Sequence, residues 1–201
     1  MRKTRNHASK GPQKAKATGN IRIIAGKHRG RKLPVLMSDG LRPTTDRVKE
    51  TVFNWLMPYM QQSNCLDCFA GAGSLGFEAM SRGAKQVTLI ELDKYAAKQL
   101  QQNKTLLNAD NVDVHQTNTL IYLAATPTSE FDIVFIDPPF RKGLTEEVIK
   151  LLENNWLAKQ ALIYIEMEIE NNQVLIPEHW SLLKEKSAGQ VSYRLYQNNE
   201  K

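Results

Sequence analysis

Apolar residues recur along this chain with two different periods, and the change of period separates its parts. Residues 1–20 are rich in Lys, Ser, Gly, Asn and Gln, which predicts an arm that is disordered without a partner. Residues 21–35 contain two short apolar runs around a basic glycine turn, a pattern typical of a β-hairpin. Between Pro43 and Pro58 apolar residues recur at helical spacing, and Pro58 cannot continue that helix.

Short apolar segments then alternate with helical ones to the end of the chain. The expected strands are residues 65–69, 86–91, 112–116, 131–137 and 161–167. The expected helices are residues 74–81, 93–108, 120–124 and 145–155. Two alternating segments around Gly189, residues 181–188 and 191–197, predict an antiparallel hairpin. This order predicts an α/β fold whose sheet is parallel until the final hairpin.

Charge is distributed unevenly over the chain. The net charge is +6, yet residues 1–32 hold 11 of the 27 basic residues and no acidic residue. The remainder holds 16 basic and 21 acidic residues. Basic segments neutralise phosphates and release counterions, which predicts nucleic-acid binding; the alternative is a solvated tail that aids solubility. We divide the chain into a disordered basic arm (1–20), a hairpin and helix facing the nucleic acid (21–60) and one α/β domain (61–201).

Composition excludes several classes of protein. With 41% hydrophobic residues the chain can form a core, so wholesale disorder is excluded. Its apolar runs are short and its basic start leads into no apolar segment, so we expect no membrane span, no secretory signal and a cytoplasmic location. Cys65 and Cys68 cannot form a disulfide framework and are interpreted as buried packing residues. The four histidines lie in unrelated segments, so we expect no metal site.

A glycine-rich segment follows the first strand of the α/β domain. After Asp67 it places Gly71, Gly73 and Gly76 with the spacing Gly-x-Gly-x-x-Gly between a strand and a helix. Glycines there let the backbone approach a ligand while helix amides face it. Glu91 ends the next strand, 18 residues after Gly73, where it would accept hydrogen bonds from ribose hydroxyls. The pattern predicts a nucleoside-cofactor site; the alternative, a tight packing turn, leaves Glu91 unexplained.

Asp67 favours S-adenosylmethionine over NAD as this cofactor. A carboxylate repels the pyrophosphate of NAD but attracts the ammonium of a methionyl group. Asn118 follows the third strand of the domain. It is placed either to read the adenine edge through its amide or to cap the next helix, and the sequence does not choose between these roles.

The tetrapeptide Asp137-Pro138-Pro139-Phe140 ends the most hydrophobic strand, at the edge where doubly wound folds bind ligands. The prolines fix the backbone and leave carbonyls as acceptors. A carboxylate beside a rigid carbonyl suits a planar amine with two N–H donors, on whose base Phe140 would stack. We interpret the motif as catalytic; a strand-ending turn with a buried Phe is the alternative. Three carboxylates further along are interpreted as a solvated rim: Glu166, Glu168 and Glu170.

These motifs resemble a known family. DCFAGAGSLGFEA, the acid in LIELD, and DPPF are similar to the motifs of class I S-adenosylmethionine-dependent amino-methyltransferases. RIIAGKHRGRKLPV and LRPTTDRVKETVFNWL, with the order of the rest, resemble the RsmD family over about residues 20–196. The resemblance implies a Rossmann-like, seven-stranded, mostly parallel sheet with an antiparallel last strand. It also implies methyl transfer to N2 of a guanine, conventionally guanine 966, of the 16S ribosomal RNA of the small subunit. We expect a monomer that acts on this RNA within a small-subunit particle, and protein-free RNA remains the alternative substrate.

The resemblance also implies roles for single residues. The residues lining the cofactor turn would be Asp67, Phe69, Ala70, Gly71 and Gly73. Glu91 would bind the ribose, and Leu92 and Asn118 would flank the adenine. Asp137 and the carbonyl of Pro138 would hold the guanine amine, with Phe140 stacking on the base.

Basic residues of the hairpin and helix are expected to grip RNA backbone rather than read bases. They are Arg22, Lys27, His28, Arg29, Arg31, Lys32, Arg42 and Arg47. Three roles remain open for Arg42, Thr44 and Arg47: they could close over the cofactor, contact phosphate or cap a helix. The DPPF motif alone also fits DNA adenine-N6 or protein glutamine methylation, and a non-catalytic RNA-binding assembly factor is a further alternative.

Overall fold

The computed structural model describes residues 17–36, 46–139, 143–169 and 174–199. A separate hairpin pairs β1 (Ala17–Arg22) with β2 (Lys32–Leu36). The strands of the main sheet are β3 (Asn64–Asp67), β4 (Gln86–Glu91), β5 (Val112–Gln116), β6 (Phe131–Ile136), β7 (Leu157–Glu168), β8 (Trp180–Ala188) and β9 (Val191–Asn198). The helices are α1 (Asp46–Leu56), the 3-10 turn η1 (Met57–Tyr59), α2 (Ser74–Ser81), α3 (Lys94–Leu107), α4 (Thr119–Leu123) and α5 (Leu144–Leu152).

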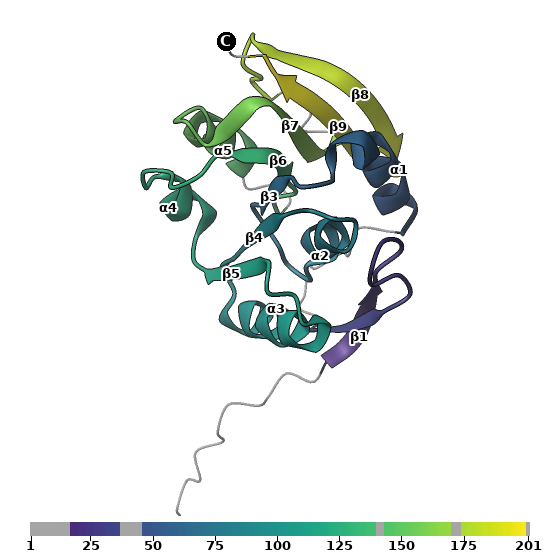
Figure 1. Cartoon of the computed structure of the whole chain (residues 1–201). Coiled ribbons are helices and arrows are strands. Elements are labelled where there is room, and N and C mark those ends of the chain that lie inside the picture. Colours follow the sequence, from purple (N-terminus) through teal and green to yellow (C-terminus); the bar gives the residue numbers. More distant parts are fainter. Residues whose placement is uncertain (1–16, 37–45, 140–142, 170–173, 200–201) are drawn as a thin grey trace, which may run out of the picture.

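The main sheet has seven strands in the order β5-β4-β3-β6-β7-β9-β8 (Figure 1). β3, β4, β5, β6 and β7 run parallel to one another, and β9 runs antiparallel to both β7 and β8. The predicted α/β fold, with seven strands and an antiparallel last strand, is therefore confirmed. The carboxyl ends of β3, β4, β5 and β6 meet at one edge of the sheet, which is the edge that carries the sequence motifs.

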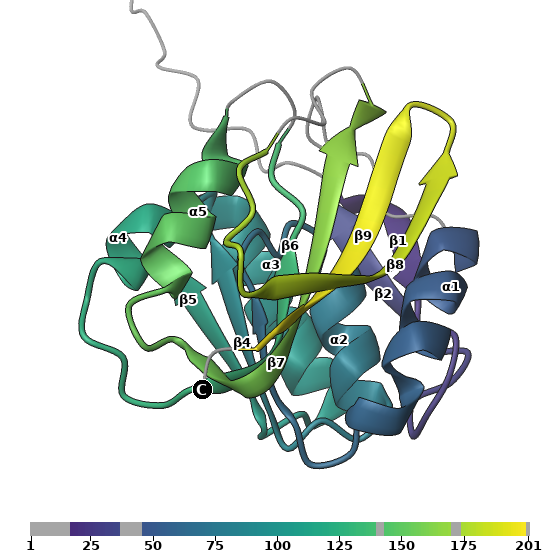
Figure 2. The ribbon, with the colours of Figure 1, turned by 90° about the horizontal axis from the view of Figure 1, so that it is seen from above.

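Helices cover both faces of this sheet (Figure 2). On one face α4 and α5 pack over a core that includes Val134, Ile163 and Ile165. On the other face α1, α2, α3 and the β1–β2 hairpin share a larger core with Phe135 and Tyr164. Side chains alternate between the faces of a strand, so buried strands read as continuous apolar runs when both faces are covered.

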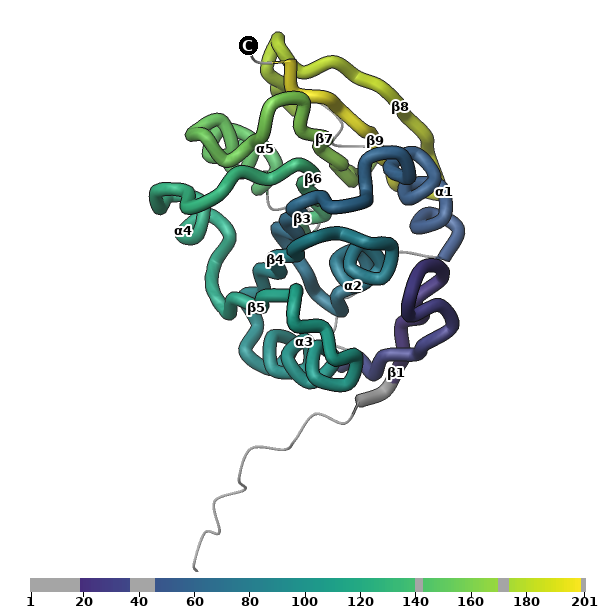
Figure 3. Tube along the Cα trace, viewed as in Figure 1, coloured from purple at the N-terminus to yellow at the C-terminus, as the bar shows by residue number. Residues whose placement is uncertain are grey.

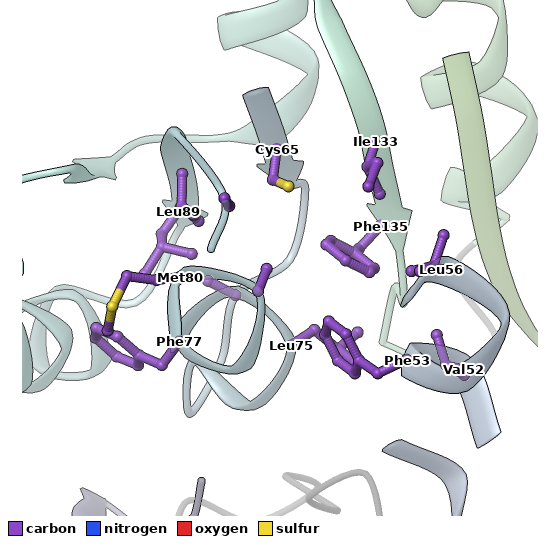
Figure 4. Packing of buried hydrophobic residues seen from close by; sticks show 14 of the residues in the cluster. Val52, Phe53, Leu56, Cys65, Leu75, Phe77, Met80, Leu89, Ile133 and Phe135 are labelled. Atoms are coloured by element: carbon purple, nitrogen blue, oxygen red, sulfur yellow. The ribbon is translucent and has the colours of Figure 1, made fainter. Parts of the chain in front are cut away.

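Helix α1 packs on the second of these faces through an apolar stripe. Val52, Phe53 and Leu56 are fully buried, and Figure 4 shows them beside Phe135 of β6 and Leu75 of α2. The ring centroids of Phe53 and Phe135 are 5.9 Å apart. The same helix buries a lysine, Lys49, whose ammonium donates to the carbonyl of Arg22 at 2.6 Å and thereby joins α1 to β1.

Several elements begin and end at the predicted residues, namely α2, β4 and β5. α3 lies between the predicted ends because Asp93 caps its first amides and Asn108 takes a left-handed conformation at its end. The prediction for residues 17–20 is wrong: they belong to β1, because their backbone pairs with β2. Residues 1–16 lie outside the described residues.

Two further predictions concern single features. Cys65 and Cys68 are buried free thiols, as predicted, and burial raises the pKa of Cys65 to about 12. None of the described helices is long and apolar enough to cross a membrane.

Candidate active site

The glycine-rich turn joins β3 to α2 at the carboxyl edge of the sheet. Gly71 and Gly73 have φ angles of 50° and 79°, in the left-handed region that favours glycine. A Cβ on Gly73 would lie only 2.6 Å from the ring of Phe77. The amide of Gly73 donates to the carbonyl of Ala70 at 2.6 Å, which closes the turn. This turn therefore requires glycine for both its conformation and its packing.

Gly76, the third glycine of the motif, brings α2 close to the sheet. A Cβ there would lie 2.1 Å from the side chain of Leu89 in β4. Its amide donates to Asp67 Oδ2 at 3.2 Å. Gly76 thus serves helix–sheet packing and also fixes the carboxylate that precedes the turn.

Asp67 is a buried carboxylate with an unsatisfied oxygen. Its exposed fraction is 2%, and burial raises its pKa to about 7, although the backbone amides of Gly76 and Phe69 act in the opposite direction. Among the described residues, no group hydrogen-bonds Asp67 Oδ1 or the hydroxyl of Ser74, the first residue of α2. Buried polar atoms without partners are costly and rare, and two of them at one turn indicate a polar ligand there. The residues present therefore fit a ligand that carries an ammonium group.

Glu91 lies on the other side of the turn, at the end of β4. Its Oε2 accepts from the amide of Gly71 and its Oε1 from the amide of Asp93, both at 2.7 Å. Burial raises the pKa of Glu91, and the amides of Asp93 and Gly71 act against that shift. Each carboxylate oxygen has two acceptor positions, so an anchored Glu91 still has acceptor capacity for ribose hydroxyls.

Asn118 caps α4. Its Oδ1 accepts from the amides of Leu120 at 2.8 Å and Ile121 at 3.4 Å. Of the two roles left open by the sequence, capping is therefore the one that the structure shows. Two large apolar side chains at the carboxyl ends of β4 and β5 are exposed: Leu92, which follows β4, is 65% exposed, and Ile121, whose amide donates to Asn118, is 69% exposed. Large apolar side chains exposed at a ligand edge suit the faces of a planar ring.

Asp137 and Pro138 directly follow β6 and are partly exposed. β6 pairs with β3 so that Phe135 lies opposite Asp67, which brings the Asp137 motif beside the glycine turn. The negative charge of Asp137 also contributes to raising the pKa of buried Tyr164 in β7, after the effects of burial and of Glu166. The predicted stacking residue Phe140 lies outside the described residues.

Glu166 does not belong to a solvated rim, so that prediction is wrong for this residue. It is only partly exposed, and its Oε2 accepts from the hydroxyl of Tyr164 at 2.9 Å. Tyr164 lies two residues earlier on the same face of β7, and its buried hydroxyl needs an acceptor, which Glu166 provides. Glu168 is partly exposed as well, and Glu170 lies outside the described residues.

The predicted RNA-binding residues differ in their surroundings. The guanidinium of Arg22 donates to Asp46 at 2.7 and 3.2 Å, so Arg22 links β1 to α1. Arg47 is exposed on the first turn of α1, and Arg42 and Thr44 lie outside the described residues. Four residues are exposed and form no ion pair within the described part of the chain: Lys27, Arg29, Arg31 and Lys32.

The basic loop between β1 and β2 is tied to the end of α2 that lies away from the glycine turn. Glu78 is fully buried and accepts from the amides of Ile24 at 2.8 Å and Ala25 at 3.0 Å. Ser81 accepts from the amide of His28 at 2.9 Å and donates to the carbonyl of Ala25 at 2.6 Å. The eight residues of α2 span about 12 Å, so the loop and the glycine turn lie at opposite ends of that helix.

The other end of this hairpin approaches the glycine turn. Val35 and Leu36 line a small pocket with Gly71 and Ala72. Figure 3 shows the hairpin trace beside α2 and α3, and Asn103 of α3 donates to the carbonyl of Pro34 at 3.0 Å. The hairpin therefore runs from the glycine turn to the other end of α2. Its basic loop residues lie at that far end and not beside Asp137.

Sequence reasoning missed four residues that organise these sites, namely Ser74, Glu78, Ser81 and Tyr164. For Glu78 a signal existed, since it is the single acidic residue of an otherwise apolar and small-residue helix. A buried acid in such a helix must find donors, but the sequence does not show which segment supplies them.

A seven-stranded sheet with an antiparallel β9, a glycine turn and an acid at the end of β4 define a protein with the class I methyltransferase fold. A family model described as "Conserved hypothetical protein 95" matches residues 21–197. The chain belongs to this family, which is the RsmD family that its motifs resemble.

Two curated relatives are closely similar to the chain. Ribosomal RNA small subunit methyltransferase D of Haemophilus influenzae is 57% identical over 190 residues, covering 92% of this chain and 98% of the relative. The protein of the same name from Escherichia coli K12 is 58% identical over 181 residues, covering 90% and 91%.

Solved structures agree with this relationship. The structure of yhhF from Escherichia coli has a TM-score of 0.84 at 55% identity and covers 90% of this chain and 98% of its own. The structure of HI0767 from Haemophilus influenzae has a TM-score of 0.80 at 55% identity, covering 90% and 100%.

Proposed function

We propose that this protein transfers a methyl group from S-adenosylmethionine to the exocyclic N2 of a guanine, guanine 966, in 16S ribosomal RNA. The two relatives that are 57% and 58% identical carry the name of a small-subunit ribosomal RNA methyltransferase. The observation that carries the proposal is the position of Asp137 and Pro138, which directly follow β6 beside the glycine turn of β3. A rigid pair of acceptors next to a cofactor turn suits an amine that must receive a group.

The turn and the neighbouring strand ends would hold the cofactor. Asp67 Oδ1 would accept from the methionyl ammonium, and Glu91 would accept from the ribose hydroxyls. Leu92 and Ile121 would cover the faces of the adenine, and the Asn118 side chain, oriented by its capping bonds, would meet its edge. Phe69 and Ala70 would line the same turn. When bound, this cofactor supplies a methyl group on a positively charged sulfur.

Asp137 and Pro138 would prepare the nucleophile. An aromatic amine is a weak nucleophile because its lone pair is delocalised into the ring. With one N–H donated to Asp137 and the other to the Pro138 carbonyl, the nitrogen is held in line with the donor, and the gain is mostly one of positioning. The nitrogen–carbon bond forms as the carbon–sulfur bond breaks, and the proton released by the methylated nitrogen passes to Asp137 or to water. Charge is dispersed during the reaction, so electrostatic stabilisation contributes less than in phosphoryl transfer. Phe140 would stack on the base.

RNA would be gripped through its backbone by the exposed basic residues of the hairpin and α1. The target base must leave its stack, because an amine inside a helix cannot reach the methyl donor. We further propose that a monomer acts on a small-subunit particle in the cytoplasm. The test therefore compares small-subunit particles with protein-free RNA.

The test is methyl transfer by wild-type and Asp137→Ala protein to small-subunit particles and to protein-free RNA, followed by nucleoside analysis. Wild type should produce N2-methylguanosine at one position. Asp137→Ala should lower kcat by at least about 100-fold while the Kd for S-adenosylmethionine changes less than about threefold. Asp110→Asn, an exposed carboxylate, serves as the control and should leave both values unchanged.

Different outcomes would contradict different parts of the proposal. Production of N6-methyladenosine in DNA or of methylglutamine would contradict the RNA guanine substrate. RNA binding without turnover by wild type would support a non-catalytic assembly factor. A loss of cofactor affinity equal to the loss of turnover in Asp137→Ala would contradict the division of roles between Asp137 and the glycine turn.

A further inference from the structure

Glu166 of β7 is a second carboxylate that, like Asp137, acts on Tyr164 at the edge that the proposed function makes catalytic, and the inference rests on that function. β6 and β7 run parallel with Phe135 opposite Tyr164. The pairing ends with Ile136 opposite Ile165, so Asp137 and Glu166 are the next residues after the last pair, and the charges of both act on Tyr164. Because side chains alternate along a strand, Glu166 lies on the same face of β7 as Tyr164, and Asp137, which follows β6, is close enough for its charge to act on the same tyrosine.

Tyr164 orients this second carboxylate. Its hydroxyl donates to Glu166 Oε2 at 2.9 Å, and its ring is fully buried, with centroids 6.2 Å from Phe135 and 6.4 Å from Tyr193. Glu166 lies opposite Tyr193 in the β7–β9 ladder. Burial, followed by the charges of Glu166 and Asp137, raises the pKa of Tyr164 well above its usual value, so this hydroxyl remains a donor. A buried tyrosine thus holds Glu166 in place beside the Asp137 motif.

The bases that carry an exocyclic amine differ in the atom next to it. In guanine the ring nitrogen N1, adjacent to the N2 amine, carries a hydrogen and is a donor. In adenine and cytosine the ring nitrogen adjacent to the amine is an acceptor, which a carboxylate repels. An acceptor pair for the amine alone, as Asp137 and Pro138 provide, does not distinguish these bases. A second carboxylate beside that pair does.

We propose that Glu166 selects guanine by accepting the N1–H of the base whose N2 amine lies on Asp137. Tyr164 acts as a positioning residue that fixes Glu166 through its hydroxyl. Two neighbouring carboxylates repel each other, and a base that offers them N–H donors from both the amine and the adjacent ring nitrogen relieves this repulsion. A base whose adjacent ring nitrogen is an acceptor adds to it. Guanine specificity therefore resides in β7, next to the amine-binding motif that follows β6.

The test compares two substrates that both carry an N2 amine. Small-subunit particles are reconstituted with RNA that has either guanine or 2,6-diaminopurine at the target position; the second base has an acceptor at N1. Wild type should prefer guanine in kcat/KM by about 10- to 100-fold, the range expected for a hydrogen bond to a charged group. Glu166→Gln offers an amide donor to N1 of diaminopurine and should reduce this preference by at least about tenfold.

Two further variants keep the test decisive. Glu168→Gln changes the next carboxylate on the same face of β7 and should leave the preference unchanged. Tyr164→Phe removes the hydroxyl that holds Glu166 and should lower the preference partly, with an unchanged Kd for S-adenosylmethionine. An unchanged preference in Glu166→Gln, or an equal fall in Glu168→Gln, would overturn the inference. Absence of guanine methylation by wild type would instead overturn the proposed function.

Discussion

Asp67, the carboxyl group that precedes the glycine turn, has a pKa that burial raises from 3.8 to about 7. A carboxyl group with a folded pKa of about 7 and an ordinary value of 3.8 favours the folded state most below pH 4. That contribution is lost as the pH rises toward 7, because the unfolded chain releases the proton more easily, and the difference corresponds to about 4 kcal/mol. The free protein therefore holds a carboxylate that an ammonium group would stabilise.

Binding of S-adenosylmethionine should depend on this proton. At pH 6 most Asp67 is protonated, and at pH 8 most is ionised and ready to pair with the methionyl ammonium, so the affinity should rise about tenfold over this range. Isothermal titration calorimetry at several pH values measures the change. Asp67→Asn should bind more weakly at pH 8 and lack this rise.

5′-Methylthioadenosine provides the matched control, because it has the nucleoside but no ammonium. Its affinity should not show the rise that Asp67 gives to S-adenosylmethionine. An identical pH profile for wild type and Asp67→Asn would show that Asp67 does not meet the ammonium.

At the scale of elements, the docking of the hairpin loop on α2 depends on one glycine. Gly26 has a φ angle of 79°, and a Cβ there would lie 1.9 Å from the carbonyl oxygen of Ser81. Gly30, in the same loop, has a φ angle of 82° with no atom of the described residues within 4 Å of the added Cβ. An alanine at Gly30 would add only the cost of a left-handed backbone, whereas an alanine at Gly26 would add that cost and also a clash with α2. Comparing the two substitutions therefore separates these costs.

Gly26→Ala should lower the free energy of unfolding by about 2–4 kcal/mol, because the loop must move away from α2. Gly30→Ala should cost only about 1 kcal/mol, the penalty for a left-handed non-glycine residue. Urea unfolding measures both values. Hydrogen exchange should accelerate at Ile24, Ala25 and His28 only in Gly26→Ala, since these amides donate to Glu78 and Ser81. Equal effects of the two substitutions would contradict a docked loop.

Local sequence predicted the elements well because their ends carry their own signals. α3 begins after its N-cap Asp93 and ends before its C-cap Asn108. The strands of the sheet are apolar runs closed by polar or glycine residues. The glycine turn, Glu91 and the Asp137 motif were also predictable, since each follows a strand at the ligand edge. The contacts of Glu78 with Ile24 and of Tyr164 with Glu166 were not. They depend on which segments the fold brings together, and local pattern does not contain that information.

At the scale of the whole molecule, the structure separates the proposed catalytic edge from the basic loop between β1 and β2. The glycine turn and Asp137 lie at the carboxyl edge of the sheet, while the loop between β1 and β2 is tied to the far end of α2 (Figure 2). An RNA that reaches both sites must extend along the hairpin side of the molecule. Its backbone would then follow the hairpin, and its target base would enter the edge beside Asp137.

This arrangement predicts that RNA affinity and cofactor affinity respond to different residues. Replacing four exposed basic residues by alanine should weaken RNA binding and make its dependence on salt shallower: Lys27, Arg29, Arg31 and Lys32. Each lost phosphate contact reduces the slope of log K against log salt by about 0.7–0.9, so the slope should fall by about 3. Filter binding over a salt series measures the slope, and calorimetry should show an unchanged Kd for S-adenosylmethionine.

A control of equal charge distinguishes this surface from a general effect of net charge. Four exposed lysines outside the hairpin are replaced together: Lys98, Lys150, Lys159 and Lys184. Both quadruple variants lose four positive charges, so long-range attraction falls equally in each. If the hairpin contacts phosphates directly, the slope of log K against log salt should fall by about 3 only in the hairpin variant. Equal slopes for the two variants would mean that RNA is attracted by overall charge and that the hairpin does not grip it.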